Sequence, residues 1–310
     1  MMKSAAATSA VGLAIPHLQC PLCRAGVQAS DAGVSCSACG EVFPTTPTGQ
    51  RDFRLRPEHR LEYVTAYVPL AYDETIDVPL RIEQPCPEPR NTFAAAVPTH
   101  LTAAQISYIP AASVGESVLD LGCGHGMQRA VLEHLGYRYH GVDYGGAAAD
   151  DLVDAHALPF QDETFDLVFS VAVLEHLAHP QLALAEVHRV LKSSRYFVGT
   201  VAFLEPFHDN SFFHFSHVGL EHALRSAGFT VEAVMPIAGW HAVRAQLEMG
   251  FGARWPHWLT KLLTLPFAWA LEAYAAVGRI AGDSARHRRE LVRARHAGAF
   301  YFVARKDPRV

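Results

Sequence analysis

The sequence has no uninterrupted run of about 18 apolar residues, the length that a membrane-spanning helix needs. Its most apolar stretch, residues 258–282, is broken by Lys261, Pro266, Glu272 and Arg279. The N-terminus lacks a leucine-rich centre and a small-residue cleavage site, which argues against a secretory leader. Positive charge is also scarce: the formal net charge is −5, which argues against non-specific nucleic-acid binding as the main activity. We therefore expect a soluble, cytoplasmic protein with reduced cysteines.

What the sequence does contain, near its start, is two C-x-x-C pairs: Cys20 with Cys23, and Cys36 with Cys39. Two such knuckles direct four thiolates tetrahedrally at one Zn²⁺ ion. The competing interpretation, a redox dithiol, would need one pair rather than two. Because four thiolates leave no open coordination position, the predicted zinc is structural. We interpret residues 13–53 as a zinc ribbon, to whose folding the metal contributes on the order of 10 kcal/mol.

Residues 54–98 are predicted to be a linker, because they hold seven prolines among mixed polar and apolar residues. From residue 99 onward, apolar runs alternate with stretches of helical periodicity, which predicts a mostly parallel sheet with helices on both faces. The alternation stops at about residues 236–296, where two or three helices are expected before a final strand. We expect strands at 116–122, 137–144, 165–173, 194–203, 229–235 and 297–305, and helices at 99–109, 127–136, 181–192 and 218–228. The predicted fold is a Rossmann-like, doubly wound α/β domain over residues 99–310, with a helical cap at about 236–296 and the N-terminal zinc ribbon.

The first of these strands runs into a turn with three glycines, in the pattern D-x-G-x-G-x-G: Asp120, Gly122, Gly124 and Gly126. A phosphate-binding loop would need a lysine after the glycines, which is missing here. The dinucleotide fingerprint would need a glycine where Met127 stands. With a carboxylate at its start, the turn favours a cationic amine over a pyrophosphate.

Two further carboxylates follow at the carboxyl edge of the predicted sheet, where open parallel sheets bind ligands. Asp143 ends the second strand, about twenty residues after the first glycine, and suits the two hydroxyls of a ribose. Asp154 lies in the next loop, where it can accept from an adenine amine while the Ala155 N–H faces a ring nitrogen. Together these positions favour an adenosine-containing cofactor.

The stretches VLDLGCGHG, GVDY, DAHALPFQDETFDLVFSVAVLEHL and HRVLK together resemble class I S-adenosylmethionine-dependent methyltransferases, of the subgroup that includes the ubiquinone/menaquinone-biosynthesis type. The resemblance covers about residues 99–235 and the last strand. It implies that the three glycines line S-adenosylmethionine, with Asp120 near its methionine amine, and that Ser170 lies near the methionine part. It also implies that Asp143 binds the ribose and that Asp154 and Ala155 bind the adenine. One departure is LKSSR at 191–195, where the family often has LKPGG.

A cluster of histidines and phenylalanines follows the fifth strand, at 203–219, where an acceptor molecule should enter. We predict that His208 or His217 contacts the acceptor or acts as its general base, with His176 as a further candidate after the fourth strand. The alternative is that these phenylalanines pack under a lid and the histidines only satisfy backbone groups.

Three functions stay open from the sequence. The preferred one is O-methylation of a hydroxyl on a small-molecule, glycan or secondary-metabolite intermediate. The second is rRNA or tRNA methylation, because the ribbon also resembles those of the activator subunit of tRNA and protein methyltransferases and of the 23S rRNA guanine-N1 methyltransferases. The third is a non-catalytic S-adenosylmethionine-binding activator or scaffold protein.

The helical insertion contains all four tryptophans, at positions 240–269. We expect it to cap the acceptor site; a dimer interface or a shallow membrane contact through Trp255, Trp258 and Trp269 is the alternative. The segment 285–296 is expected to be a basic helix with a solvated face, or a contact for an anionic partner.

Overall fold

The computed structural model describes residues 14–63, 89–93, 97–98, 101–277 and 291–307. The centre of the predicted linker and residues 285–290 of the predicted basic helix lie outside these ranges. Residues 291–295 are helical. No helix in the described part of the chain combines the length and the apolar character needed to cross a membrane.

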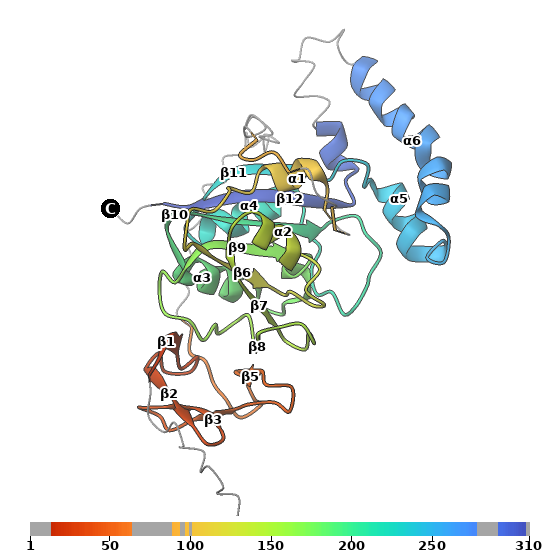
Figure 1. The fold of residues 1–310 in the computed structure, drawn as a ribbon. Coiled ribbons are helices and arrows are strands. Elements are labelled where there is room, and N and C mark those ends of the chain that lie inside the picture. The colour runs from red at the N-terminus through yellow and green to blue at the C-terminus, as the bar shows by residue number, and fades with distance from the viewer. Residues whose placement is uncertain (1–13, 64–88, 94–96, 99–100, 278–290, 308–310) are drawn as a thin grey trace, which may run out of the picture.

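The body of the protein is an eight-stranded sheet with the order β11-β12-β10-β9-β6-β7-β8-β5 (Figure 1). Its strands are β5 (Arg51–Asp52), β6 (Ser117–Leu121), β7 (Arg138–Asp143), β8 (Asp151–Leu152), β9 (Phe165–Val171), β10 (Leu191–Ala202), β11 (Phe229–Pro236) and β12 (Ala299–Lys306). The pairings from β5 through β10 are parallel, and β12 runs antiparallel to both of its neighbours. The prediction of a mostly parallel α/β sheet is confirmed.

Helices cover the two faces of this sheet and bury two apolar layers (Figure 1). They are α1 (Ala103–Ser107), α2 (Arg129–His134), α3 (Pro180–Val190) and α4 (His217–Ser226), with the short η1 turn (Leu174–His176) after β9. Leu184 and Val187 of α3 pack in one cluster, and Leu132 of α2 packs in the other. Because helices occupy both faces, the strands read as continuous apolar runs rather than alternating ones.

Helix α3 ends earlier than expected, and the segment LKSSR already belongs to β10. The pairing of β10 with β9 is irregular between Leu191 and Tyr196, and Ser194 has a φ of 63°. That position falls where the resembling family often carries a glycine, which adopts this backbone conformation without a steric penalty. Ser194 therefore stands at a left-handed backbone position where the similar family often has a glycine, and β10 still forms.

The N-terminal segment forms a four-stranded antiparallel sheet of β1 (Ala14–Gln19), β2 (Gly26–Ser30), β3 (Gly33–Cys36) and β4 (Val42–Pro44). Backbone hydrogen bonds join the N-terminal segment to the body. Strand β5 pairs in parallel with β8 at the edge of the sheet, and the Gln19 N–H donates to the Pro159 carbonyl. Phe43 and Phe53, both buried, belong to the same apolar cluster as the core of the sheet. The ribbon sheet therefore stays separate from the eight-stranded sheet, but the segment that follows it adds β5 to the edge of that sheet and shares its core.

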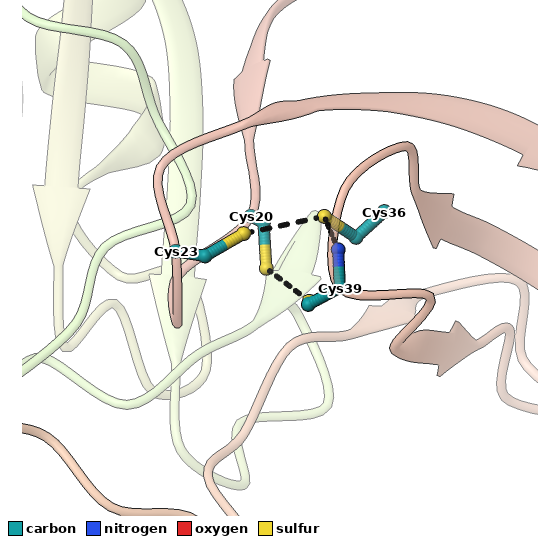
Figure 2. Close-up of side chains that lie close together, drawn as sticks. All are labelled: Cys20, Cys23, Cys36 and Cys39. Atoms are coloured by element: carbon teal, nitrogen blue, oxygen red, sulfur yellow. Dashed lines mark hydrogen bonds between the residues drawn. The ribbon is translucent and has the colours of Figure 1, made fainter.

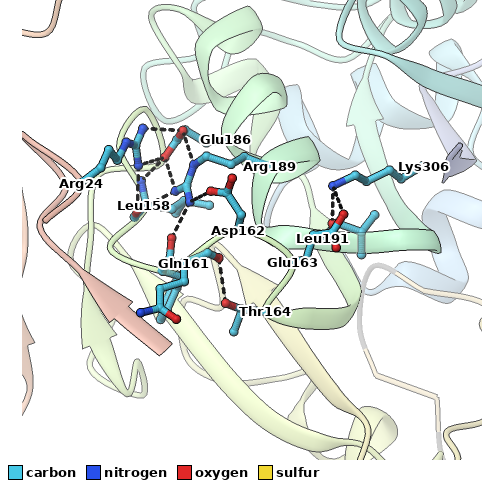
Figure 3. A network of polar contacts seen from close by, with 11 residues as sticks. Arg24, Leu158, Gln161, Asp162, Glu163, Thr164, Glu186, Arg189, Leu191 and Lys306 are labelled. Atoms are coloured by element: carbon cyan, nitrogen blue, oxygen red, sulfur yellow. Dashed lines mark hydrogen bonds and ion pairs between the residues drawn. The ribbon is translucent and has the colours of Figure 1, made fainter. Parts of the chain in front are cut away.

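Two ion pairs between partly exposed arginines and buried carboxylates hold the N-terminal segment against the body. Arg24 donates two hydrogen bonds to Glu186 of α3, at 2.6 and 2.9 Å, within the polar network of Figure 3. Arg51 binds Asp151 in the same bidentate way, at 2.6 and 2.7 Å. Burial alone would raise the pKa of Asp151, but hydrogen bonds from His140 and Arg51 outweigh it and lower that pKa. Such pairs fix orientation, because a carboxylate buried without its partner is strongly destabilising.

The described part of the insertion before β12 contains α5 (Ala242–Gln246), the π-helical turn η2 (Leu247–Phe251) and the long helix α6 (His257–Val277), besides the helical residues 291–295. Helix α6 stands at the side of the molecule beyond β11 and β12 (Figure 1). Its inner side packs on the start of the insertion through Phe267, whose ring lies 5.1 Å from that of His241, the N-cap of α5. Two to three inserted helices were expected, and the described residues contain α5, η2 and α6.

Candidate functional site

The four cysteines of the ribbon converge on one point (Figure 2). Cys20 and Cys23 lie between β1 and β2, Cys36 ends β3, and Cys39 lies between β3 and β4. The Sγ atoms of Cys20 and Cys39 are 3.7 Å apart, and those of Cys23 and Cys36 are 3.4 Å apart. A tetrahedral Zn²⁺ site with Zn–S bonds of about 2.3 Å requires sulfur atoms about 3.8 Å apart. The geometry is compatible with a four-thiolate zinc site.

Hydrogen bonds within the second knuckle support this arrangement. The backbone N–H groups of Ala38 and Cys39 donate to the Cys36 sulfur at 3.4 and 3.5 Å. Gly40, next in the chain, has a φ of 75°, which suits glycine and lets the knuckle turn back into β4. Such N–H···S bonds orient the thiolates and offset part of their negative charge, as outer contacts do at metal sites.

The glycine turn between β6 and α2 forms a cradle at the carboxyl edge of the sheet. Gly122, Gly124 and Gly126 have φ values of 74°, 52° and 72°. A Cβ at Gly122 would clash with Val173, and one at Gly126 would touch Ala148. A Cβ at Gly124 would meet no protein atom within 4 Å. The turn therefore packs tightly against its surroundings at both ends and leaves space beside its middle glycine.

Asp143 lies at the end of β7, next to that space. Its carboxylate accepts from the Gly124 N–H at 2.9 Å and from the N–H groups of Gly145 and Gly146, both at 2.8 Å. A carboxylate offers about four acceptor positions, so one remains after these three bonds. Asp143 thus holds two loops together and keeps capacity for a ligand hydroxyl.

The ribbon reaches the same loop, a contact that sequence reasoning did not anticipate. The Gln50 side-chain amide donates to the carbonyls of Gly146 and Ala149, at 3.2 and 2.8 Å. Arg54 donates to the Tyr144 carbonyl at 3.2 Å. No local sequence pattern indicates these contacts, because the residues that form each hydrogen bond are 90 or more positions apart.

Asp120 is placed differently from the other candidates. It is 1% exposed and accepts a hydrogen bond of 2.7 Å from the Tyr139 hydroxyl on the neighbouring strand. Burial raises the pKa of Asp120 to about 7, although the Tyr139 bond and Arg129 oppose that rise. Through its hydrogen bond with Tyr139, Asp120 therefore links β6 to β7 next to the glycine turn.

Asp154, Ala155 and Ser170 all lie at the same edge of the sheet. Asp154 receives hydrogen bonds from the His156 N–H at 3.0 Å and pairs with the His156 ring at 2.6 Å. Burial would raise the pKa of Asp154, but these His156 contacts outweigh it and lower the pKa, so the group is ionised. Ala155, partly buried, packs on the core, and Ser170 near the end of β9 has a buried hydroxyl without a partner among the described residues.

Two of the predicted histidines are brought together. The rings of His176, in η1, and His208, in the loop after β10, lie 5.2 Å apart at their centroids. His208 Nδ1–H donates to the Pro206 carbonyl at 3.0 Å, because a carbonyl oxygen can only accept, so Nε2 stays free of this contact. Burial and the neighbouring His208 lower the pKa of His176, so that ring is neutral at pH 7 and able to accept a proton.

Glu175 completes this group and was missed in the sequence. It is fully buried; one carboxylate oxygen accepts from the Ala202 N–H at 3.0 Å, and the other has no partner in the described structure. Burial raises the pKa of Glu175 to about 7. Ligand atoms of Glu175, His176 and His208 lie within 4.8 Å of one another, a geometry that could hold a divalent cation. The available signal was an acidic residue next to His176 at the end of an apolar strand.

His217, the third predicted histidine, lines a different space. A cavity of about 380 Å³ lies between β11, the start of α4 and the inner side of α6, and His217, Trp240, His241 and Leu271 contribute to its wall. Neither His176 nor His208 lines it. Burial lowers the pKa of His217, and its Nε2 atom is buried without a partner among the described residues. The helical insertion therefore forms part of the wall of a cavity at the side of the sheet.

Residues 119–199 match a family model described as "Methyltransferase domain". This segment contains the glycine turn, Asp143, Asp154, β9 and η1. The match supports the interpretation of the sheet as a class I S-adenosylmethionine-dependent methyltransferase domain. It covers neither the ribbon nor the helical insertion.

A phthiotriol/phenolphthiotriol dimycocerosates methyltransferase of Mycobacterium tuberculosis is 32% identical over 148 residues, which cover 42% of this chain and 51% of that protein. The chain spans about half or less of the length of the curated relatives it matches. Among solved structures, a complex of the Haloferax volcanii Trm112 methyltransferase activator with a methyltransferase matches at a TM-score of 0.43 and 22% identity, over 66% of this chain and 88% of that one. Phosphoethanolamine N-methyltransferase 2 of Haemonchus contortus matches at a TM-score of 0.44 and 18% identity, over 66% and 52%.

Proposed function

We propose that the protein is an S-adenosylmethionine-dependent methyltransferase that methylates a hydroxyl group of a small-molecule, glycan or secondary-metabolite intermediate. The observation that carries the cofactor assignment is the open space at Gly124 beside the remaining acceptor position of Asp143. The match of residues 119–199 to a methyltransferase domain supports the reaction class. The M. tuberculosis relative, whose name places its substrate among dimycocerosates, supports an acceptor other than nucleic acid.

The residues present fit the proposed cofactor. Gly122, Gly124 and Gly126 would line it, Asp143 would accept from its ribose, and Asp154 with the Ala155 N–H would bind its adenine. The buried Ser170 hydroxyl would face its methionine part. Asp120 would act from behind the turn by positioning β6, because its carboxylate is bonded to Tyr139. When bound, S-adenosylmethionine supplies a methyl group already activated as a sulfonium.

The protein's own task is then to align the acceptor and remove its proton. Alignment of two reactants contributes up to about 7–11 kcal/mol in well-oriented cases. We assign the general base to the pair of His176 and His208, because both lie at the edge of the sheet that carries the glycine turn and both rings have backbone partners. A positioned base contributes about 10²–10⁴-fold to such a reaction. His217 would instead contact a part of the acceptor that enters the cavity beside β11.

The ribbon zinc is proposed to be structural. Four thiolates would fill its coordination shell, and the ribbon would act by holding the loop after Asp143 through Gln50 and Arg54. In this structural role the ribbon contacts its own chain and does not bind RNA. The acidic net charge of −5 also disfavours an RNA acceptor.

Native mass spectrometry of the full-length protein, with and without S-adenosylmethionine, tests the proposal. The wild type should carry one zinc ion and bind the cofactor, and Asp143→Ala should retain zinc and lose the cofactor. Glu133→Ala, which removes an exposed carboxylate on α2, is the matched control and should bind normally. Absence of cofactor binding in the wild type would overturn the methyltransferase proposal.

Turnover separates the remaining alternatives. Formation of S-adenosylhomocysteine with hydroxylated small molecules, and not with rRNA or tRNA, is the expected result. Turnover with RNA that falls steeply as salt rises would replace the proposed acceptor class by nucleic acid. Cofactor binding without turnover on any acceptor would indicate a binding or activator protein, in which His176→Ala should leave cofactor binding unchanged.

A further inference from the structure

Helix α6 exposes a wide apolar surface. Its outer face, as we name it, consists of Trp258, Leu262 and Trp269, which are 67%, 54% and 69% exposed; Leu263, 53% exposed, lies to one side of it. Trp258, Leu262 and Trp269 follow one another at intervals of four and seven residues, which places them in one stripe of an α-helix. Trp255, just before the helix, is 45% exposed. Single exposed apolar residues are ordinary, but a contiguous patch of this kind marks an interaction surface.

The side of α6 that faces the protein carries apolar residues, among them Phe267 and Leu271, together with two buried threonines. Thr260 and Thr264 are buried, with 0% and 4% exposure. Thr260 donates to the carboxylate of Glu248, and Thr264 donates to the Thr260 carbonyl at 2.9 Å. A helix on the surface of a globular domain normally turns its apolar stripe inward and its polar residues outward. In α6 the aromatic stripe points away from the body, so its burial requires an external partner.

The chemistry of this face fits a lipid surface. Tryptophan and tyrosine are the side chains enriched at the boundary between headgroups and acyl chains. Arg254 and Lys261 flank the first turns of the helix, both exposed and without an ion pair in the described part of the chain. The acidic Glu248 nearby is 7% exposed and already bonded to Arg244. The first half of α6 therefore presents apolar side chains together with cations, which complement anionic headgroups.

A second copy of the chain fits less well. A two-fold interface uses the same patch on both subunits, so it would bring Arg254 and Lys261 of each copy to one contact. No described helix could span a bilayer, which restricts contact with lipid to its surface. We propose that the outer face of α6 inserts into the surface of a lipid bilayer containing anionic headgroups. The inference goes beyond methyl transfer and stands independently of it.

Vesicle flotation with the full-length protein tests this. Phosphatidylcholine vesicles with and without phosphatidylglycerol are the probes. The wild type should float with the anionic vesicles and bind neutral ones more weakly. Trp258→Glu combined with Trp269→Glu should reduce binding to anionic vesicles by at least about tenfold, because it removes apolar area and adds charge of the lipid's sign. Val114→Glu, at a fully exposed apolar position on the body, is the control and should float like the wild type.

Fluorescence gives a second readout, because all four tryptophans lie at 240–269. Emission should shift to shorter wavelength when anionic vesicles are added to the wild type, and Lys261→Gln should weaken that shift. Wild-type protein that stays unbound, or a double variant that floats equally well, would overturn the proposal. A wild type that is dimeric in lipid-free buffer and becomes monomeric in the double variant would also overturn it, since the face would then bind a second copy. Unchanged cofactor binding and thermal melting verify that the variants fold.

Discussion

Replacing Gly124 by alanine is the change that isolates the cofactor cradle. The residue has a φ of 52°, and a Cβ built there meets no protein atom within 4 Å. The added methyl group therefore touches no protein neighbour and projects into the space proposed for the cofactor. Its steric cost toward a bound ligand is about 1–3 kcal/mol, the usual penalty for overpacking. This converts to a loss of about 5- to 150-fold in S-adenosylmethionine affinity.

The backbone cost of the change is separable from that effect. An alanine at positive φ is strained by about 1–2 kcal/mol wherever it stands. Gly115, with a φ of 86° and no atom within 4 Å of its built Cβ, lies outside the glycine turn. Gly115→Ala therefore matches the strain without touching the cradle.

Isothermal titration with S-adenosylhomocysteine and chemical unfolding, applied to both variants, distinguish the two contributions. Both variants should lose similar unfolding free energy, and only Gly124→Ala should lose affinity. If both variants bind S-adenosylhomocysteine as tightly as the wild type, the placement of the cofactor beside Gly124 is refuted. If both variants lose the same affinity, the effect comes from backbone strain.

Three further predictions follow from the same structure. Removal of the ribbon metal, by a strong chelator or by Cys36→Ser, should unfold the ribbon, because the metal contributes on the order of 10 kcal/mol to its folding. Cofactor binding should then weaken, because Gln50 would release the loop after Asp143. Intact cofactor binding without zinc would contradict this coupling. The pKa of Asp120 is raised to about 7, so its contribution to the stability of the wild type is complete below its unfolded pKa and is lost as pH rises to about 7, by about 4 kcal/mol in all, of which about 3 kcal/mol falls between pH 5 and pH 8. Asp120→Asn should remove this pH-dependent loss; denaturant unfolding of both proteins at pH 5 and pH 8 measures it, and an equal pH dependence in the two proteins would exclude a buried, titrating Asp120. His176→Ala should lower kcat by about 10²–10⁴-fold without changing cofactor affinity; a loss confined to KM would assign His176 to acceptor binding instead.

Local patterns in the sequence were sufficient for the elements of the domain. Alternating apolar runs and helical periodicity predicted the parallel sheet, because side-chain spacing reports directly on burial. The carboxyl ends of parallel strands meet at one edge, so the glycine turn, Asp143 and Asp154 could be placed together before any coordinates were known. Likewise the paired C-x-x-C spacing predicted that four sulfur atoms converge, and they do. Their roles toward cofactor and zinc remain predictions.

Long-range pairing was decided only by the tertiary structure. The short strand β5 carries too few residues to show periodicity, and only its partner β8 makes it a strand. The contacts of Gln50 with the loop after Asp143, and the meeting of Glu175 with His208, join positions far apart in the chain, where no local pattern links them. The direction of α6 is a third case. Its composition predicted a helix with tryptophans, but whether those tryptophans face the body or solvent depends on how the whole insertion packs against β11. Sequence spacing specifies which residues share a face, and only packing decides where that face points.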